Sequence, residues 1–265
     1  MGKAIRSAKK TLSVFASNRF LFEELVKRDF EHKYKRTILG MAWSVLSPLL
    51  TLLVMKLVFT QFFGRTTPHY TIYLFAGTIV LSFFKEATNN GMTSMISNAS
   101  VLNKINVPKY LFLFSKNVSS LVNFSLTLII FFIFCIFDSI TFHWGFFLLI
   151  YPIACLVVLN LGVGMVLSAM YVFFRDTKYL YSVFLTLLTY VSAVFYRVDS
   201  FPPLVQRFFL LNPVYVYIKY IRTVVIDGMV PSLQYHALCL LYAFLAACVG
   251  ALFYKRYNRK FVYYF

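Results

Sequence analysis

Charge is scarce in this sequence. Only 13% of its 265 residues are charged, about half the share in a typical soluble domain, while 60% are hydrophobic and 20% are aromatic. So few charges cannot cover a globular surface, and so much apolar content excludes intrinsic disorder. Cysteine is sparse too: all four residues lie inside apolar runs, which excludes a secreted disulfide scaffold. The composition therefore predicts an integral membrane protein.

Several chemical signatures are also missing from the sequence. The phosphate-binding pattern Gly-x-x-x-x-Gly-Lys-Ser/Thr does not occur, so nucleotide hydrolysis by a P-loop is not expected. The four histidines are scattered and match no metal-ligand spacing. None of the nine acidic residues lies at the middle of an expected span, which argues against an ion-coupled carrier. We therefore expect no catalytic residue, no metal and no cofactor bound by this chain.

What the chain does contain is long apolar runs. A membrane-spanning helix needs about 20 mostly apolar residues. Six segments meet or approach this length: 39–63, 70–94, 112–137, 144–174, 179–196 and 232–254. The second is the weakest, because its uninterrupted apolar part is only 70–84, so its helix must continue past Lys85 and Glu86. The sequence predicts an all-α membrane protein with six transmembrane helices.

The net charge is +17, and the distribution of the basic residues along the chain predicts how the protein is oriented in the membrane. Lysine and arginine number 20 in segments 1–37, 85–116, 175–178 and 255–265, against 5 in the segments on the other side of the expected spans. An excess of basic residues marks the cytoplasmic side. We therefore expect a multi-pass protein of the cytoplasmic membrane with both termini inside. Segment 1–37 would be cytoplasmic, 38–254 the transmembrane domain and 255–265 a basic tail. The basic clusters alternate with spans, so no nucleic-acid partner is expected.

Segment 19–36 has the pattern of an amphipathic helix. Phe22, Leu25, Val26, Phe30 and Tyr34 fall on one helical face, while acidic and basic residues occupy the other. A basic amphipathic helix of this kind lies in the membrane interface. Two interpretations stay open for it, an anchor or a gate at the cytoplasmic entrance.

Two further segments are more structured than plain loops. Segment 98–108 alternates apolar and polar residues and ends at Pro108, after which a new helix can start. It is interpreted either as a short helix that docks in a partner protein or as an ordinary turn. The outer segment 198–231 is rich in aromatic residues and proline. It predicts two short helices, separated at Asn212–Pro213, that dip into the bilayer and return.

Tyrosines gather around the fifth span and the outer segment. Interfacial belts and lipid contact account for most aromatic residues of a membrane protein. A row of rings also suits a sugar chain, because apolar sugar faces pack on rings and phenol hydroxyls form hydrogen bonds. The candidate channel aromatics are Tyr181, Tyr190, Phe195 and Tyr196. Lys56, inside the first span, either snorkels to the interface or faces a polar conduit.

Four stretches in order resemble one protein family. KRDFEHKYKRTILGMAWSVLSPLL, beginning at Lys27, resembles the entry to the first span in permease subunits of type-2 ABC exporters for bacterial cell-surface polysaccharides such as O-antigen, capsule and teichoic acid. The family positions are occupied by Arg28, Asp29, Tyr34, Leu39, Gly40, Trp43 and Pro48. Segment 73–109 resembles the second span and the coupling helix of that family. Segment 173–184, FFRDTKYLYSVF, resembles the turn before its fifth span, and segment 210–228, LLNPVYVYIKYIRTVVIDG, resembles its outer gate.

The resemblance implies a role for each of these segments. The coupling helix would comprise Asn98, Val101, Leu102, Asn103, Lys104, Ile105, Val107 and Pro108. The gate helix and entrance would comprise Phe22, Arg28, Asp29, Phe30, Tyr34, Arg36 and Trp43, and the outer gate Asn212, Pro213, Tyr215 and Tyr217. Basic residues near the cytoplasmic face would attract a lipid diphosphate, unless they only set the topology: Arg28, Lys33, Lys35, Arg36 and Arg175.

The resemblance also implies partners and a substrate. The permease would form a homodimer joined to two copies of a separate ATP-binding subunit, which would hold ATP and magnesium. The substrate would be a polysaccharide or polyol-phosphate chain on undecaprenyl diphosphate. The alternatives are a permease of the same superfamily for drugs or small lipids, an ion-coupled carrier, and a membrane-embedded glycosyltransferase. The last would need clustered catalytic acids or metal ligands, which the sequence does not offer.

Overall fold

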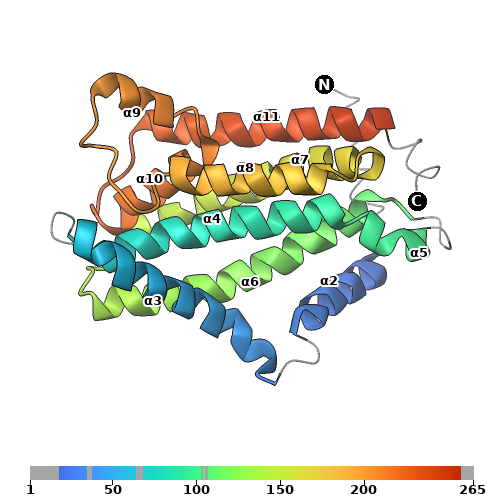
Figure 1. Cartoon of the computed structure of the whole chain (residues 1–265), viewed down its shortest axis with the longest axis horizontal. Helices are drawn as coiled ribbons and strands as arrows, with labels where there is room; N and C mark the ends of the chain where they lie inside the picture. Colours follow the sequence, from blue (N-terminus) through green and yellow to red (C-terminus); the bar gives the residue numbers. More distant parts are fainter. Residues whose placement is uncertain (1–17, 35–37, 64–67, 103, 105–106, 258–265) are drawn as a thin grey trace.

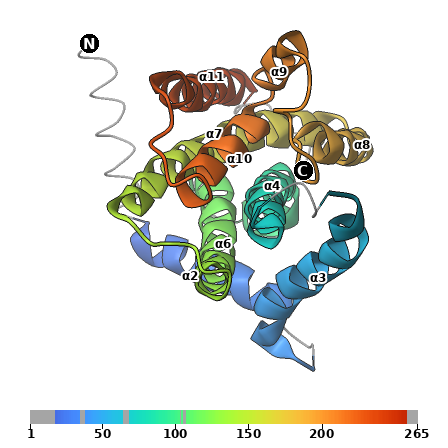
Figure 2. The ribbon, with the colours of Figure 1, turned by 90° about the vertical axis from the view of Figure 1, so that its left-hand side faces the viewer.

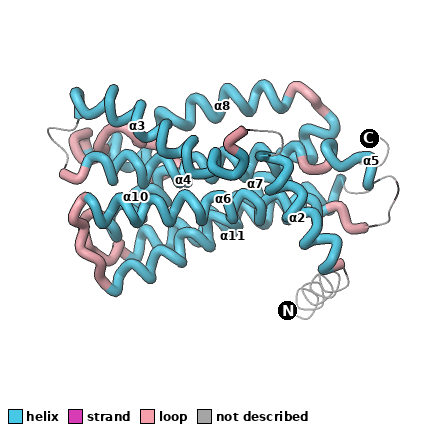
Figure 3. The backbone as a smooth tube through the Cα atoms, turned by 90° about the horizontal axis from the view of Figure 1, so that it is seen from below, coloured by secondary structure: helices cyan, strands magenta, loops and turns pink. Residues whose placement is uncertain are grey.

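The computed structural model describes residues 18–34, 38–63, 68–102, 104 and 107–257. In this part of the chain helices are joined by loops and no strand occurs, which confirms the all-α class (Figure 3). The α-helices are α2 (Arg19–Tyr34), α3 (Trp43–Phe63), α4 (Tyr70–Thr93), α5 (Ala99–Leu102), α6 (Tyr110–Phe137), α7 (Ile150–Phe173), α8 (Thr177–Val191), α9 (Pro203–Phe209), α10 (Pro213–Val225) and α11 (Leu233–Tyr257). Short 3-10 helices are η1 (Gly40–Ala42), η2 (Ile96–Asn98) and η3 (Trp144–Leu149).

Helix α4 lies at the centre of the bundle. It contacts α3, α6, α7, α8 and α10, which surround it in the end-on view of Figure 2. Its first half is apolar and buried, and Phe75 there packs edge-on against Phe131 and Phe134 of α6 with ring centroids 5.6 Å apart. Its second half carries Lys85 and Glu86, and the helix continues past both to Thr93, as the sequence predicted. Helix α4 therefore runs from the apolar interior of the bundle to the start of η2 and α5.

Four of the described helices are long and apolar enough to cross a membrane. These stretches are Trp43–Thr60, Tyr110–Phe137, Trp144–Phe173 and Leu233–Tyr257. They correspond to four of the six predicted spans. The other two are present as helices α4 and α8. Helix α4 has lower mean hydropathy because its second half is polar, and α8 has only 15 residues.

The predicted fifth span, 179–196, ends earlier in the structure than in the prediction. Helix α8 stops at Val191, and Ala193 adopts a positive φ of 50°. The carbonyl groups that follow are bound by side chains from other helices. Tyr70 donates a hydrogen bond to the carbonyl of Phe195, and Arg222 donates to those of Ala193 and Val194. Because these tertiary donors replace the helical ones, the chain leaves the helix before the apolar run ends.

Helices α7 and α11 approach each other closely at two glycines. A Cβ added to Gly250 of α11 would lie 2.5 Å from the carbonyl oxygen of Gly162 in α7. A Cβ added to Gly162 would collide with the backbone of Ala246 and lie 2.7 Å from the amide nitrogen of Ala247. Small residues allow this contact between membrane helices, whose packing relies on close van der Waals fit. The pair forms one side of the bundle (Figure 1).

The two ends of the bundle carry different elements. Helices α2 and α5 and the C-terminal end of α11 lie at one end, whereas α9 and α10 lie at the other (Figure 1). The segments expected in the cytoplasm and those expected outside are thus separated along the bundle axis. The assignment of one end to the cytoplasm stays the prediction from charge.

Candidate functional site

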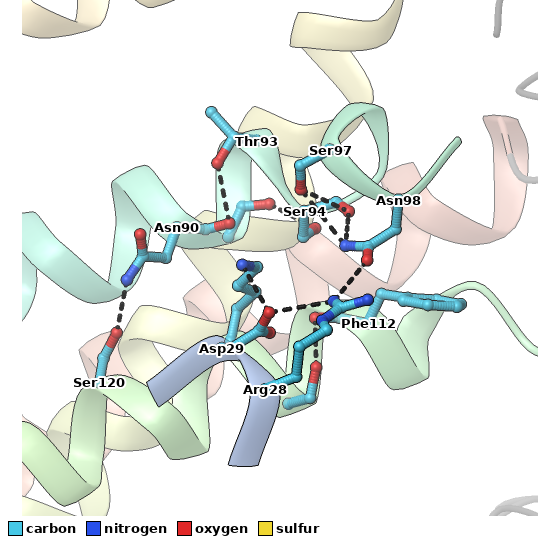
Figure 4. A network of polar contacts seen from close by, with 12 residues as sticks. Arg28, Asp29, Asn90, Thr93, Ser94, Ser97, Asn98, Phe112 and Ser120 are labelled. Carbon is cyan, nitrogen blue, oxygen red and sulfur yellow. Dashed lines mark hydrogen bonds and ion pairs between the residues drawn. The ribbon is translucent and has the colours of Figure 1, made fainter. Parts of the chain in front are cut away.

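A polar cluster joins helix α2 to η2, at the start of the predicted coupling segment (Figure 4). The Arg28 guanidinium donates a hydrogen bond of 2.6 Å to the Asn98 side-chain oxygen and pairs with Asp29 at 3.0 Å. Lys116 of α6 pairs with the same Asp29 oxygen at 3.0 Å. The Asp29 side chain is only 5% exposed, so both cations act on a largely desolvated carboxylate. The cluster fixes α2 to α6 and to η2 at the same point.

Asn98 is held as firmly on its other side. Its amide nitrogen donates to the carbonyl oxygen of Ser94 at 2.8 Å and to the Ser97 hydroxyl at 3.3 Å. Asn98 is 2% exposed and ends η2, which lies between α4 and α5 in the chain. Asn98 is therefore bonded both to Ser94, which follows α4, and to Arg28 of α2.

The structure describes only part of the predicted coupling helix. Helix α5 covers Ala99–Leu102, which is shorter than the predicted segment 98–108. Val101, Leu102, Val107 and Pro108 are half-buried and Lys104 is exposed, while Asn103 and Ile105 lie outside the described residues. Leu102 packs against a small cluster that includes Met95 of the α4–η2 junction and Tyr254 of α11.

The amphipathic pattern of helix α2 is confirmed, and its apolar face contacts protein. Leu25 is buried, and Phe22, Val26 and Phe30 are half-buried. Helix α2 packs against α6 (Figure 2). The side chains of Lys33 and Tyr34, and residues Lys35 and Arg36, lie outside the description. Trp43, predicted at the entrance, is not on α2; it begins α3 and is 38% exposed. Arg175, predicted to attract the diphosphate, follows α7, and its guanidinium lies over the Tyr171 ring.

The four candidate channel aromatics differ in exposure, and the rings of Tyr190 and Phe195 lie 6.3 Å apart. Tyr181 is 6% exposed and donates a hydrogen bond of 2.6 Å to Thr88 of α4, and Phe195 is buried against Phe59 of α3 with the rings stacked at 4.4 Å. Tyr190 is 62% exposed, and Tyr196 donates to its carbonyl oxygen. That these four residues line a sugar track stays a prediction. Tyr190 is the most exposed of the four.

The outer segment forms two short helices, as predicted. Asn212 caps α10, because its side-chain oxygen accepts from the amides of Val214 and Tyr215, and Pro213 occupies the first turn. Tyr215 and Tyr217 are buried, and the Tyr217 hydroxyl donates to the carbonyl of Cys239 in α11. Helix α10 is therefore packed into the bundle. Its service as an outer gate stays a prediction.

Arg222 of α10 was not singled out by the sequence. It is 4% exposed and donates hydrogen bonds to the carbonyl oxygens of Tyr73, Ala193 and Val194 at 2.9–3.2 Å. Its guanidinium also lies 3.4 Å from the centre of the Tyr73 ring. Gly77 makes room for it, since a Cβ there would lie 2.7 Å from the guanidinium. One side chain thus ties α10 to α4 and to the end of α8.

Asp199, in the loop before α9, pairs with Lys219 at 3.1 Å and with Arg197 at 3.0 Å. Partial burial raises the pKa of Asp199, but the hydrogen bonds and charges of Arg197 and Lys219 outweigh it, and the pKa lies below the ordinary 3.8. The carboxylate therefore stabilises the fold fully above pH 3.8 and loses this contribution as the pH falls through its folded value.

We expect Asp199→Asn to lower the stability of the protein in detergent at pH 7 by about 1 kcal/mol or less, since the pair is partly exposed. The difference from the unmodified protein should shrink as the pH falls below 3.8. Thermal unfolding midpoints across pH measure this. The same substitution at exposed Asp176 serves as control, and a difference that grows in acid would contradict the assignment.

A groove of about 470 Å³ lies between α3, α4 and α6. Each helix lines it with three polar side chains on one face: Ser44, Ser47 and Thr51; Thr78, Ser82 and Glu86; Ser120, Asn123 and Thr127. Across its wall the Asn123 amide donates to a Glu86 oxygen at 2.9 Å. The signal for this groove was present in the sequence as polar residues three or four positions apart within apolar helices. It is visible only once the three helices are known to face one another.

The long apolar helices, gathered in one bundle with loops at its two ends, define a multi-pass helical membrane protein. The sequence profile of the ABC-2 type transporter family matches residues 21–226. The chain belongs to this family, which confirms the resemblance seen in its four motifs.

Relatives agree with this assignment. An O-antigen export system permease protein, RfbA, of Klebsiella pneumoniae is 26% identical over 232 residues, covering 84% of this chain and 86% of that protein. A protein of the same description from Myxococcus xanthus is 27% identical over 184 residues, covering 69% and 70%. The polysialic acid transport protein KpsM of Escherichia coli is 22% identical over 240 residues, covering 85% and 90%.

Proposed function

We propose that this chain is the transmembrane subunit of an ATP-driven exporter that moves a polysaccharide, or a polyol-phosphate polymer, on undecaprenyl diphosphate across the cytoplasmic membrane. The observation that carries the proposal is similarity over most of the chain to permeases named for O-antigen export and polysialic acid transport. Two copies of the chain would join two copies of a separate ATP-binding subunit that holds ATP and magnesium. Both termini would lie in the cytoplasm.

The contact between Arg28 and Asn98 supports a mechanism for coupling. In the proposal, α5 and the residues after it dock on the ATP-binding subunit, and nucleotide-driven closure moves them. Because Asn98 is bonded to the end of α4 and to Arg28 of α2, the same motion would shift the central helix and the entrance helix together. The diphosphate would approach this basic end of the bundle, where Arg28, Lys116 and Arg175 lie and Lys33, Lys35 and Arg36 are expected.

Deletion of the gene tests the function itself. Cells without this chain should lose surface polysaccharide and accumulate lipid-linked polymer inside, and the unmodified chain should restore export. The measurement is surface glycan in intact cells compared with glycan released by lysis. Normal surface glycan in the deletion strain would overturn the proposal.

Cross-linking tests the coupling segment. In a background without native cysteines, Val101→Cys and Leu102→Cys should form cross-links to the co-expressed ATP-binding subunit. Met229→Cys is the matched control, because it is 59% exposed in the loop after α10, at the other end of the bundle. If neither variant cross-links, or if Met229→Cys does so equally, the docking assignment is wrong.

A further inference from the structure

We infer that the groove between α3, α4 and α6 is a binding site for the saccharide part of the transported substrate, built within a single copy of the chain. This inference rests on the proposed function and adds a place and a chemistry to it. The sugar track expected from the sequence is a row of aromatic rings around the fifth span. The groove is a different surface. Each of its three helices contributes one stripe of polar side chains, which are hydroxyl groups except for the Glu86 carboxylate and the Asn123 amide.

The lining is the first argument. Polar side chains within membrane helices are costly unless they face the bundle interior or a water-filled cavity. Here α3, α4 and α6 each turn a stripe of three such residues toward the same space. Helix α3 is otherwise open to its surroundings, since only 11% of Trp43–Thr60 is buried, against 39% of Trp144–Phe173. A polar stripe on so exposed a helix indicates a polar occupant.

The charge of the lining favours sugar over diphosphate. Among the described residues that line the groove, Glu86 is the one charged side chain, and its carboxylate is held by the Asn123 amide. A carboxylate accepts hydrogen bonds from sugar hydroxyls, whereas it repels a phosphate. The cations Arg28 and Lys116 lie instead in the cluster on Asp29. Sugar and diphosphate would therefore occupy separate places.

The hydroxyl groups are arranged to accept hydrogen bonds. Thr51 donates to the carbonyl of Ser47, Thr78 to that of Leu74 and Thr127 to that of Asn123, at 2.8–3.1 Å. Their protons are bonded within their own helices, so no hydroxyl donor is unpaired at these three described positions. Their oxygen lone pairs can accept from hydroxyl donors of a ligand.

Size and aromatic content agree with this chemistry. A volume of about 470 Å³ lies within the range of about 300–1,000 Å³ typical of small-molecule sites. Phe83 and Phe124 stack on each other at 4.5 Å and form the buried apolar floor of the groove, whereas Trp43, at the start of α3, is 38% exposed. Apolar sugar faces pack on an accessible aromatic ring such as that of Trp43. The groove therefore offers both kinds of contact that a sugar makes.

The groove also adjoins the coupling cluster. Ser120 lines the groove and accepts a hydrogen bond of 2.9 Å from Asn90, which lies one helical turn beyond Glu86 on α4 (Figure 4). From there α4 leads through Ser94 to Asn98 and Arg28. A substrate whose diphosphate lies at the basic end would thus have its first sugars at the inner end of the groove.

The first test compares two substitutions on one helix. Asn123→Leu, which removes the amide from the groove, should reduce surface polysaccharide in complemented cells at least tenfold. Ser125→Leu is the matched control, because Ser125 is exposed outside the groove and donates to its own helix backbone. Glu86→Ala should act like Asn123→Leu. Co-purification of the ATP-binding subunit shows that each variant is folded, and normal export by both groove variants would overturn the inference.

The second test probes occupancy without relying on export. Ser82→Cys, in a background without native cysteines, should react with a small hydrophilic maleimide in cells whose polymer synthesis is blocked. It should react at least threefold more slowly in cells that make the polymer. Equal reaction rates would mean a water-filled cleft only, and no reaction in either would mean a closed or lipid-filled one; both outcomes overturn the inference. The proposed function is judged separately, by the deletion strain.

Discussion

Replacing Arg222 by Met is expected to lower the unfolding midpoint of the detergent-solubilised protein by about 10 °C. The substitution keeps an unbranched side chain but removes the donors for three carbonyl groups, those of Tyr73, Ala193 and Val194. Each buried acceptor left without a partner costs about 1–3 kcal/mol. The loss is large because a single side chain of α10 binds both α4 and the segment that follows α8.

The same substitution should release the outer segment. Without Arg222, apolar packing has to hold α10 against α4 at this point, so limited proteolysis should cut 197–212 faster than in the unmodified protein. Arg207→Met is the control, because Arg207 lies on the exposed side of α9. A midpoint within about 2 °C of the unmodified protein would show that water replaces the guanidinium at little cost.

Gly162→Ala is expected to have the second large effect, a protein that fails to accumulate in the membrane. The added methyl group would collide with the backbone of Ala246, and backbone cannot move aside as a flexible side chain does. The helices α7 and α11 would have to separate along the contact that Gly250 shares with Gly162. Overpacking of this kind costs about 1–3 kcal/mol or more.

Gly164→Ala is the matched control for this prediction. It lies two residues further along α7, where the nearest atom to an added Cβ is the Cα of Gly91 at 3.5 Å, an ordinary contact. Alanine also favours a helix over glycine by about 1 kcal/mol. Membrane protein yield and the unfolding midpoint should therefore stay level or rise for Gly164→Ala. Equal loss in both variants would refute the argument from close approach.

The sequence predicted the helices α2 and α5 better than the contacts between them. The patterns in 98–108 and 19–36 identified two segments whose described helices, α5 and α2, lie at one end of the bundle. Arg28 was singled out there as a partner for a diphosphate. Its bond to Asn98 could not be read from the sequence, because 70 residues separate the two positions and only the packing of α2 on α6 brings them together.

The hydrogen-bond partner of Glu86 is a second contact that could not be read from the sequence. In the sequence, Lys85 and Glu86 marked the point past which the second span has to continue. In the structure the two neighbours point to different helices: Lys85 donates to Thr189 of α8, and Glu86 accepts from Asn123 of α6. Successive residues on a helix are about 100° apart, so the assignment of each to a neighbour depends on where α6 and α8 lie.

By itself, the sequence determined that this is a helical membrane protein, where most of its long helices run, and which family it resembles. Those properties follow from composition, from the length of apolar runs and from local motifs, all of which are short-range. Only the tertiary structure decided where α8 ends, how α2 is tied to Asn98, and that three polar stripes share one groove. These depend on contacts between residues far apart in the chain, which no local pattern encodes.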